Sequence, residues 1–274
     1  MMSRHVESGY LPIPGARLYF EAAGEGHPLV LIHAGVADNR MWDEQFTVFA
    51  QRYRVIRYDT RGFGKSKTED VEFSNHQDLL DMLDHLNVRK AYLVGASRAG
   101  GIAINFTLEH PERVDGLALV GSALGGLEHQ PTDDEKRNFG IMEETWKQKD
   151  FVRLADLEVK MWVDGPGQSE TRVAPALRER VRNMILNTYT THVTEGKSKG
   201  LNPPAAKRLA EIKTPTLIIV GDLDESGVHA AAELLERGVA RSRKVVMAGT
   251  AHLPSMERPA EFNRIVLEFL ADIS

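Results

Sequence analysis

The sequence predicts an α/β protein with a mostly parallel β-sheet, helices on both faces of the sheet and an inserted helical segment. Three observations predict this architecture. Several short apolar runs are nearly continuous and end at turn-forming residues, as strands buried on both faces do. Segments with helical periodicity alternate with these runs, and such alternation favours a parallel sheet. One long stretch, residues 126–203, is charged and helical in pattern, without a recognisable strand.

The expected elements follow from the spacing of apolar residues. Six runs have the length of a buried strand: 29–32, 55–58, 91–94, 117–120, 217–220 and 244–247. Three segments repeat apolar residues at intervals of three and four, which predicts helices over 78–86, 102–108 and 262–270. A long basic helix is expected over 176–189.

The change of pattern after the expected strand 117–120 suggests how the chain is divided. We interpret residues 126–203 as a helical cap, inserted into a core that consists of residues 1–125 and 204–274. Pro203 and Pro204 mark the return to the core, because proline ends extended connections and begins helices well.

Composition and charge exclude several kinds of function. The 274 residues carry a net charge of -5, so no positive excess is available for a phosphate backbone and nucleic acid is not an expected partner. Cysteine is absent, which excludes disulfides, thiolate metal sites and a cysteine nucleophile. The start lacks the apolar segment of a signal peptide, and the most apolar stretch, 28–32, is too short to cross a bilayer. We therefore expect no membrane partner and a cytoplasmic location.

The ten histidines show no pair with metal-ligand spacing beside an acid, so we expect no metal site and no cofactor. The sequence does not determine the oligomeric state, and a homodimer stays open.

A serine lies at a sharp connection between a strand and a helix. The run 91–94 continues into Gly95-Ala96-Ser97-Arg98-Ala99-Gly100, and a helix follows at once. Such a turn projects the serine hydroxyl above the sheet, and it needs small neighbours because the backbone leaves little room. The helix also directs free N–H groups toward the serine. Ser97 is therefore the candidate nucleophile.

A serine hydroxyl needs a base to take its proton and an acid to orient that base. His252 follows the run 244–247 and precedes the last expected helix, which puts it at a strand end on the same edge of the sheet as Ser97. His229 could serve instead, but it opens a helical run. The acid is expected at another strand end, where Asp222 and Asp224 follow the run 217–220.

With these motifs the chain resembles the α/β-hydrolase superfamily, whose serine lies in Gly-x-Ser-x-Gly. Here the last glycine is replaced by Ala99, so we expect a slightly adjusted turn. The chain order of serine, acid and histidine matches the family. In the family the acid follows the strand-end glycine by three positions, which favours Asp224 and makes Asp222 the second choice.

The resemblance extends to the loop after the first expected strand, where His33 precedes Trp42 by nine positions, as in similar hydrolases. It implies that the backbone N–H groups of Gly35 and Arg98 hold an oxyanion. The family's usual glycine is Ala34 here. His33 is expected to brace this loop. The stretch 58–66 looks like a phosphate loop at first, but its spacing does not fit one, and we interpret it as a structural turn held by Asp59 and Arg61.

The resemblance covers 15–273 and implies a serine hydrolase that cleaves a carboxylic ester or lactone through an acyl-enzyme, closest to enol-lactonases and small carboxylesterases. The expected partner is thus a small-molecule ester or lactone. Carbon–carbon bond hydrolases and perhydrolases keep the same three residues and remain alternatives, as does a hydrolase-like receptor that binds a small molecule without turnover.

Two features leave their roles open at the level of sequence. Arg98 is long and charged beside the candidate nucleophile, so it either lies under the cap or pairs with a core acid, or else it attracts an anionic substrate. Trp146, Met161 and Trp162 of the expected cap either line a substrate pocket or belong to the cap's own core.

Overall fold

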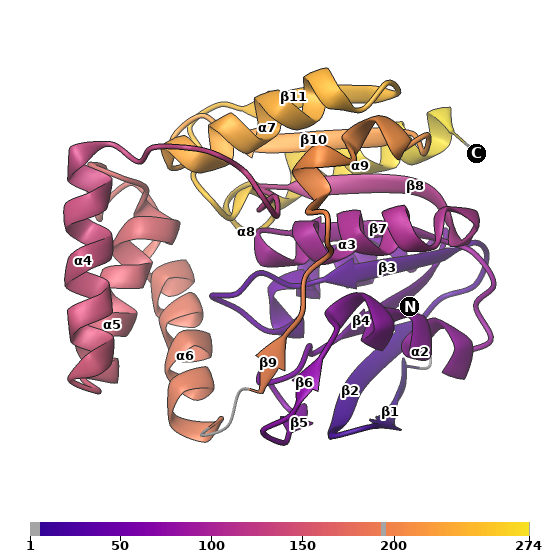
Figure 1. Ribbon diagram of the computed structural model, residues 1–274, viewed down its shortest axis with the longest axis horizontal. Coiled ribbons are helices and arrows are strands. Elements are labelled where there is room, and N and C mark those ends of the chain that lie inside the picture. Colours follow the sequence, from indigo (N-terminus) through magenta and orange to yellow (C-terminus); the bar gives the residue numbers. More distant parts are fainter. Residues whose placement is uncertain (1–5, 193–195, 274) are drawn as a thin grey trace.

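The computed structural model describes residues 6–192 and 196–273, and its centre is a twisted sheet with strands in the order β1-β2-β4-β3-β7-β8-β10-β11 (Figure 1). The strands are β1 (Val6–Ile13), β2 (Ala16–Ala23), β3 (Pro28–Ile32), β4 (Arg54–Tyr58), β7 (Ala91–Ala96), β8 (Val114–Val120), β10 (Thr216–Gly221) and β11 (Ser242–Met247). Short strands are β5 (Lys67–Thr68), β6 (Glu72–Phe73) and β9 (Lys197–Ser198). Residues 1–5 and 274 of the predicted core and 193–195 of the predicted cap lie outside the described residues.

The prediction of a mostly parallel sheet is confirmed. The six predicted strands correspond to β3, β4, β7, β8, β10 and β11, and each pairs in parallel with its neighbours among them. The antiparallel hairpin of β1 and β2 was not predicted. The outer strand β1 is mostly exposed, so it lacks the continuous apolar run by which the other strands were found.

Helices cover both faces of the sheet, which also confirms the prediction. One apolar core joins the sheet to α2 (Asn75–His85), α3 (Arg98–Glu109) and α7 (Ser226–Gly238). The opposite core joins it to α1 (Asp43–Phe49) and α9 (Pro259–Asp272). Alternate residues of one strand enter the two cores, for example Val30 and Leu31 of β3. Strands buried on both sides need apolar residues at consecutive positions.

A helical insertion follows β8 and stands beside the sheet, at the left of Figure 1. It consists of α4 (Asp133–Lys147), α5 (Phe151–Glu158), a π-helical turn over Val159–Asp164, and α6 (Pro175–Thr191). After α6 the chain returns through β9, which pairs with β6. Because β6 lies between β4 and α2, part of the stretch predicted to be a strandless cap forms a small sheet with the core. The division into core and cap stays a prediction.

The arrangement gathers several loops at one edge of the sheet. Parallel strands present their carboxyl ends on the same side, so the connections that follow β3, β4, β7, β8 and β10 meet there. In open α/β sheets this edge is where ligands bind. Within residues 6–192 and 196–273, no helix is both long enough and apolar enough to cross a membrane.

Candidate active site

Ser97 stands on a strained turn between β7 and α3. Its φ of 55° and ψ of -122° lie outside the regions that non-glycine residues prefer. Its neighbours are fixed by close packing, because a Cβ on Gly95 would lie 2.5 Å from the carbonyl oxygen of Ala99. One on Gly100 would lie 2.1 Å from Oγ of Ser122. The position that close packing reserves for glycine is 100, and Ala99 occupies the place of the last glycine of Gly-x-Ser-x-Gly.

Ser97, His252 and Asp224 form a continuous hydrogen-bonded series. The His252 Nε2 atom is 2.8 Å from Oγ of Ser97. On the other side of the ring, Nδ1 is 2.8 Å and 3.0 Å from the two carboxylate oxygens of Asp224. His252 and Asp224 are buried, whereas Ser97 is partly accessible. The structure thus brings together the three residues that the sequence placed on three separate strand ends.

The charge of Asp224 controls the protonation of His252. Burial of the imidazole opposes its protonation, but the charge and hydrogen bond of Asp224, together with the charges of Glu225 and Glu257, outweigh this effect and raise the pKa of His252 above 6.5. Since the carboxylate accepts from Nδ1–H, Nε2 of the neutral ring is free to accept the hydroxyl proton of Ser97. A serine in this position can be activated as a nucleophile.

The two alternatives from the sequence have other roles. Asp222 is exposed, and its carboxylate accepts a hydrogen bond of 2.6 Å from the backbone N–H of Gly249. His229 lies half-buried in α7. Neither belongs to the hydrogen-bonded series of Ser97.

Two backbone N–H groups near Ser97 are unpaired among the described residues, those of Gly35 and Arg98. The preceding N–H, that of Ala34, donates to Sδ of Met41 at 3.2 Å. Gly35 follows β3 and Arg98 begins α3, so both residues lie at the carboxyl edge of the sheet. These are the two donors that the sequence predicted for an oxyanion.

His33 braces the loop that carries Gly35. Its Nδ1–H donates to the carbonyl oxygen of Ala34 at 2.8 Å, and its Nε2 accepts from the backbone N–H of Thr60 at 3.0 Å. This pattern requires a neutral ring. Burial, and then the charge of Arg98, lower the pKa of His33 to about 4, which keeps the ring neutral.

The loop after β4 is held by the side chains that the sequence singled out. Asp59 accepts hydrogen bonds of 2.8 Å from the backbone N–H groups of Asn39 and Lys65. Arg61 donates two hydrogen bonds to Asp78, at 2.7 and 2.9 Å. This stretch is therefore a structural turn, and it carries Thr60 and Phe63, which contact the side chain of Arg98.

A cavity of about 300 Å³ opens beside Ser97 and His252. Its wall comes from the loop after β8, from α4 and α7, and from the π-helical turn. The other lining residues are Gly121, Ser122, Ala123, Leu124, Leu127, His129, Pro131, Phe139, Trp162, Glu225, Gly227, Val228 and Ala231. Apolar side chains dominate this wall, so the cavity suits an uncharged group.

Of the three aromatic and thioether candidates in the insertion, Trp162 lines this cavity, with its ring 4.7 Å from that of His252. Met161 is buried within the insertion. Trp146 is exposed and packs against Phe151 and Tyr189. Of these three residues, only Trp162 is seen to line the cavity beside Ser97 in the described part of the chain.

Three supporting residues were missed in the sequence. Gly121, with a φ of 51°, leaves room for the His252 and Asp224 pair, because its Cβ would lie 3.2 Å from Nδ1 and 3.3 Å from Oδ2. Glu257 accepts from the backbone N–H of Ala251 at 2.9 Å and so fixes the loop before His252. Glu135 joins α4 to Ser226. Two of the three have a signal in the sequence: Gly121 is a turn residue at a strand end, and Glu135 stands three positions after Thr132, the spacing of a capping box.

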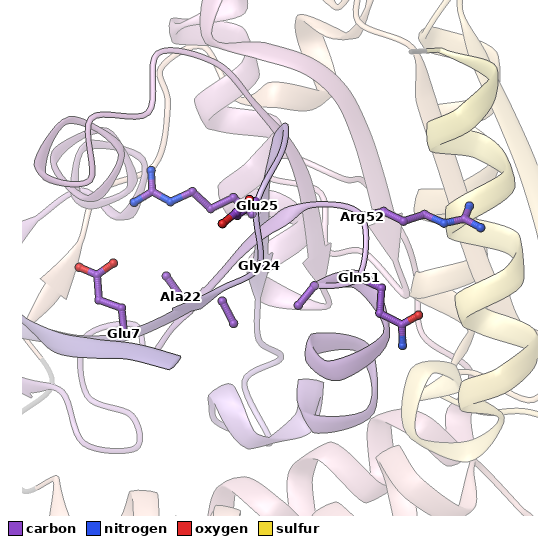
Figure 2. Close-up of a pocket in the computed structure, with 9 residues that line it drawn as sticks. Glu7, Ala22, Gly24, Glu25, Gln51 and Arg52 are labelled. Carbon is purple, nitrogen blue, oxygen red and sulfur yellow. The ribbon is translucent and has the colours of Figure 1, made fainter. Parts of the chain in front are cut away.

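A larger hollow of about 520 Å³ lies at the opposite edge of the sheet, where β3 and β4 begin (Figure 2). Its charged residues do not converge, since the side chains of Glu7 and Arg52 extend toward opposite sides. No residue of the Ser97 series lines it. In the part of the chain that the structure describes, no group of three or more histidine and acidic side chains is arranged to hold a metal.

Comparison with known proteins identifies the family of the chain. Residues 27–259 match the family model of the alpha/beta hydrolase fold. The chain is 30% identical over 272 residues to a 2-hydroxy-6-oxononadienedioate/2-hydroxy-6-oxononatrienedioate hydrolase of Escherichia coli strain K12, covering 93% of this chain and 91% of the relative. It is 27% identical over 260 residues to the AB hydrolase superfamily protein YisY of Bacillus subtilis strain 168, covering 92% of this chain and 94% of the relative.

Among solved structures, the enol-lactonase from Burkholderia xenovorans LB400 has a similar fold, with a TM-score of 0.75 and 23% identity over 96% of this chain and 100% of that chain. The family model alone covers more than half of the sequence. The chain therefore belongs to the alpha/beta hydrolase fold family.

Proposed function

We propose that the protein is a serine hydrolase that cleaves a carboxylic ester or lactone through an acyl-enzyme on Ser97. The observation that carries this proposal is the hydrogen-bonded series from Ser97 Oγ through both ring nitrogens of His252 to Asp224. Its order and its distances are those that general-base activation of a serine requires.

The reaction proceeds in two steps. Ser97 gives its proton to Nε2 of His252 and its oxygen attacks the substrate carbonyl, while the N–H groups of Gly35 and Arg98 stabilise the negative oxygen. His252 then protonates the leaving alcohol. In the second step His252 takes a proton from water, which attacks the acyl carbon. The bond from that carbon to Oγ of Ser97 then breaks, His252 returns the proton to Oγ, and the acid is released.

The assignment is tested with Ser97→Ala and a fluorophosphonate, which phosphonylates an activated serine. We expect the variant to lose about 10⁴- to 10⁶-fold in kcat and to resist labelling, while the wild type is labelled at Ser97. The exposed Ser169 provides a matched control, because Ser169→Ala removes a hydroxyl outside the site. Normal ester hydrolysis by Ser97→Ala would contradict the proposal, and a wild type that is not labelled would favour a receptor without turnover.

A second candidate function is carbon–carbon bond hydrolysis, favoured by the relative from E. coli. The name of that enzyme's substrate describes carboxylate and oxo groups but no ester, so its hydrolysis breaks a carbon–carbon bond. Comparing p-nitrophenyl esters, an enol-lactone and a vinylogous diketone on the same preparation separates the two functions. Turnover of the diketone alone would replace the ester assignment and keep the roles of the three residues.

A further inference from the structure

The half-buried Arg98 has no carboxylate partner among the described residues, whereas the buried Arg57 and Arg61 have such partners. Arg57 donates to Glu21 and Asp43, and Arg61 forms a two-bond pair with Asp78. For Arg98, no ion pair exists among the described residues. A buried charge without a counter-charge is costly, so an arginine that remains in this state at a reaction site points to a ligand that supplies the charge.

The contacts of Arg98 satisfy only part of its hydrogen-bonding capacity. Its Nη2 donates to Oγ1 of Thr60 at 2.5 Å, and its Cζ lies 4.7 Å from the ring centre of Phe63. Nε is buried and makes no hydrogen bond, so the bond from Nη2 is the one side-chain hydrogen bond of Arg98 among the described residues. Burial lowers the pKa of Arg98 to about 10, so the group still carries its positive charge at neutral pH.

Arg98 borders an open space next to Gly35. A Cβ atom built on Gly35 would have one non-neighbouring heavy atom within 4 Å among the described residues, and that atom is Nε of Arg98, at 4.0 Å. The backbone N–H groups of these same two residues are the proposed oxyanion donors. An anionic group held by the guanidinium would therefore lie within a few bonds of the reacting carbonyl.

The position of His252 indicates which part of the substrate carries the anionic group that Arg98 would hold. His252 protonates the leaving alcohol in the proposed reaction, and it lines the apolar cavity together with Trp162. The alcohol part thus lies on the cavity side of Ser97. The acyl part extends the other way, toward Gly35 and Arg98.

We infer that Arg98 binds a carboxylate on the acyl part of the substrate, so that the protein prefers short esters or lactones of dicarboxylic acids. This inference rests on the proposed function. A guanidinium offers two parallel N–H donors to a carboxylate, a stronger interaction than one between neutral partners.

The test compares monomethyl succinate with methyl levulinate, in which a neutral acetyl group of the same shape replaces the carboxylate. Arg98→Met keeps the length of the side chain and removes its charge. We expect this variant to lose about 10- to 100-fold in kcat/KM on monomethyl succinate and less than about threefold on methyl levulinate. Arg98→Lys should recover only part of the loss, because an ammonium lacks the forked donors.

Lys65→Met is the matched control, because it removes one positive charge from an exposed side chain on the loop that holds Phe63. It should leave the ratio between the two esters unchanged. An equal loss on both esters in Arg98→Met would overturn the inference, as would the same shift of the ratio in Lys65→Met.

Labelling of Ser97 by the fluorophosphonate gives a second readout that does not depend on turnover. Monomethyl succinate should slow the labelling of the wild type more than methyl levulinate does, and this difference should vanish in Arg98→Met. If both esters slow the labelling of the wild type equally, only the inference about Arg98 is contradicted. Absence of labelling contradicts the proposed function itself, so the two failures are distinguishable.

Discussion

The two sides of Ser97 are lined by different kinds of residue. On one side, the loop after β8, the helices α4 and α7, and Trp162 enclose an apolar cavity of about 300 Å³. On the other side, Gly35, Thr60 and Phe63, from the loops after β3 and β4, lie around the guanidinium of Arg98, which forms no ion pair with any described residue. We call these the apolar side and the cationic side. If the proposed function holds, this difference predicts that the two ends of the substrate are selected independently, by burial at one end and by charge at the other.

The largest effect is expected from Asp224→Asn, which acts on the centre that both sides share. Replacing the carboxylate by an amide removes the charge beside His252 and disturbs its tautomer, so kcat/KM should fall about 10⁴-fold. The loss should be equal for monomethyl succinate and methyl levulinate. Asp222→Asn, which changes the exposed aspartate two positions earlier, should retain most of the activity. A loss confined to one ester would show that the two sides do not serve a common centre.

The pH profile of the same variant provides an independent readout. His252 must be neutral to act as a base, and Asp224 raises its pKa above 6.5 despite the opposing effect of burial. Wild-type kcat/KM should therefore fall as the pH is lowered through a value above 6.5. Without the negative charge, burial dominates, so the acid limb of Asp224→Asn should move to lower pH. If the acid limb did not move, the group that titrates in it would not be His252.

A smaller effect, on the apolar side alone, is expected from Trp162→Ala. The indole forms part of the cavity wall beside His252, and burying a large apolar group contributes about 1.5–3 kcal/mol. For methyl, butyl and hexyl esters of levulinic acid, the variant should lose about 10- to 100-fold on the longest alcohol and little on the shortest. The ratio between monomethyl succinate and methyl levulinate should stay as in the wild type.

Trp146→Ala is the matched control, because Trp146 is exposed and its ring contacts Phe151 and Tyr189 of the helical insertion. It should leave the preference for alcohol length intact. If both tryptophan variants changed that preference equally, the cavity beside Ser97 would not be the alcohol site.

The sequence reveals the core better than it reveals the selectivity of the site. Parallel strands buried on both faces leave continuous apolar runs, and the candidate residues Ser97 and His252 were located at the ends of such runs. The run 217–220 left Asp222 and Asp224 both open, and the resemblance to the family was needed to favour Asp224. Neither the apolar runs nor the positions of strand ends distinguish the role of Trp146 from that of Trp162. Trp162 lies in a π-helical turn over Val159–Asp164, which departs from the helical period, so its direction cannot be deduced from spacing.

Long-range contacts set a second limit on what the sequence reveals. That Arg98 has no acid partner is a property of all the elements around it, so residue identity alone left both interpretations open. Glu135 begins α4 as part of a local capping box with Thr132, a pattern that sequence can show. Its contact with Ser226 crosses to a different element and becomes visible only in the fold.

The smallest effect is expected from Glu135→Gln, which weakens the hydrogen bonds between α4 and α7 on the apolar side. Glu135 is buried, and its carboxylate accepts from the backbone N–H and the hydroxyl of Ser226 at 2.7 and 2.5 Å. An amide would turn its NH₂ group toward one of these donors. We expect a loss of about 1–2 kcal/mol in the free energy of unfolding, measured by urea denaturation at pH 7. Glu144→Gln, on the exposed face of α4, is the control and should lose far less.

The pH dependence of this difference identifies its origin. Burial opposes the ionisation of Glu135, but the hydrogen bonds from Ser226 and Thr132 outweigh it and lower the pKa to about 2 from 4.5. A carboxylate whose pKa is lowered on folding stabilises the protein above its unfolded value, and this contribution is lost as the pH falls from about 4.5 toward 2. The gap between wild type and Glu135→Gln should therefore narrow over that range. A constant gap would mean that the substitution acts through packing, and the hydrogen bonds of Glu135 would then not be what fastens the apolar side to the core.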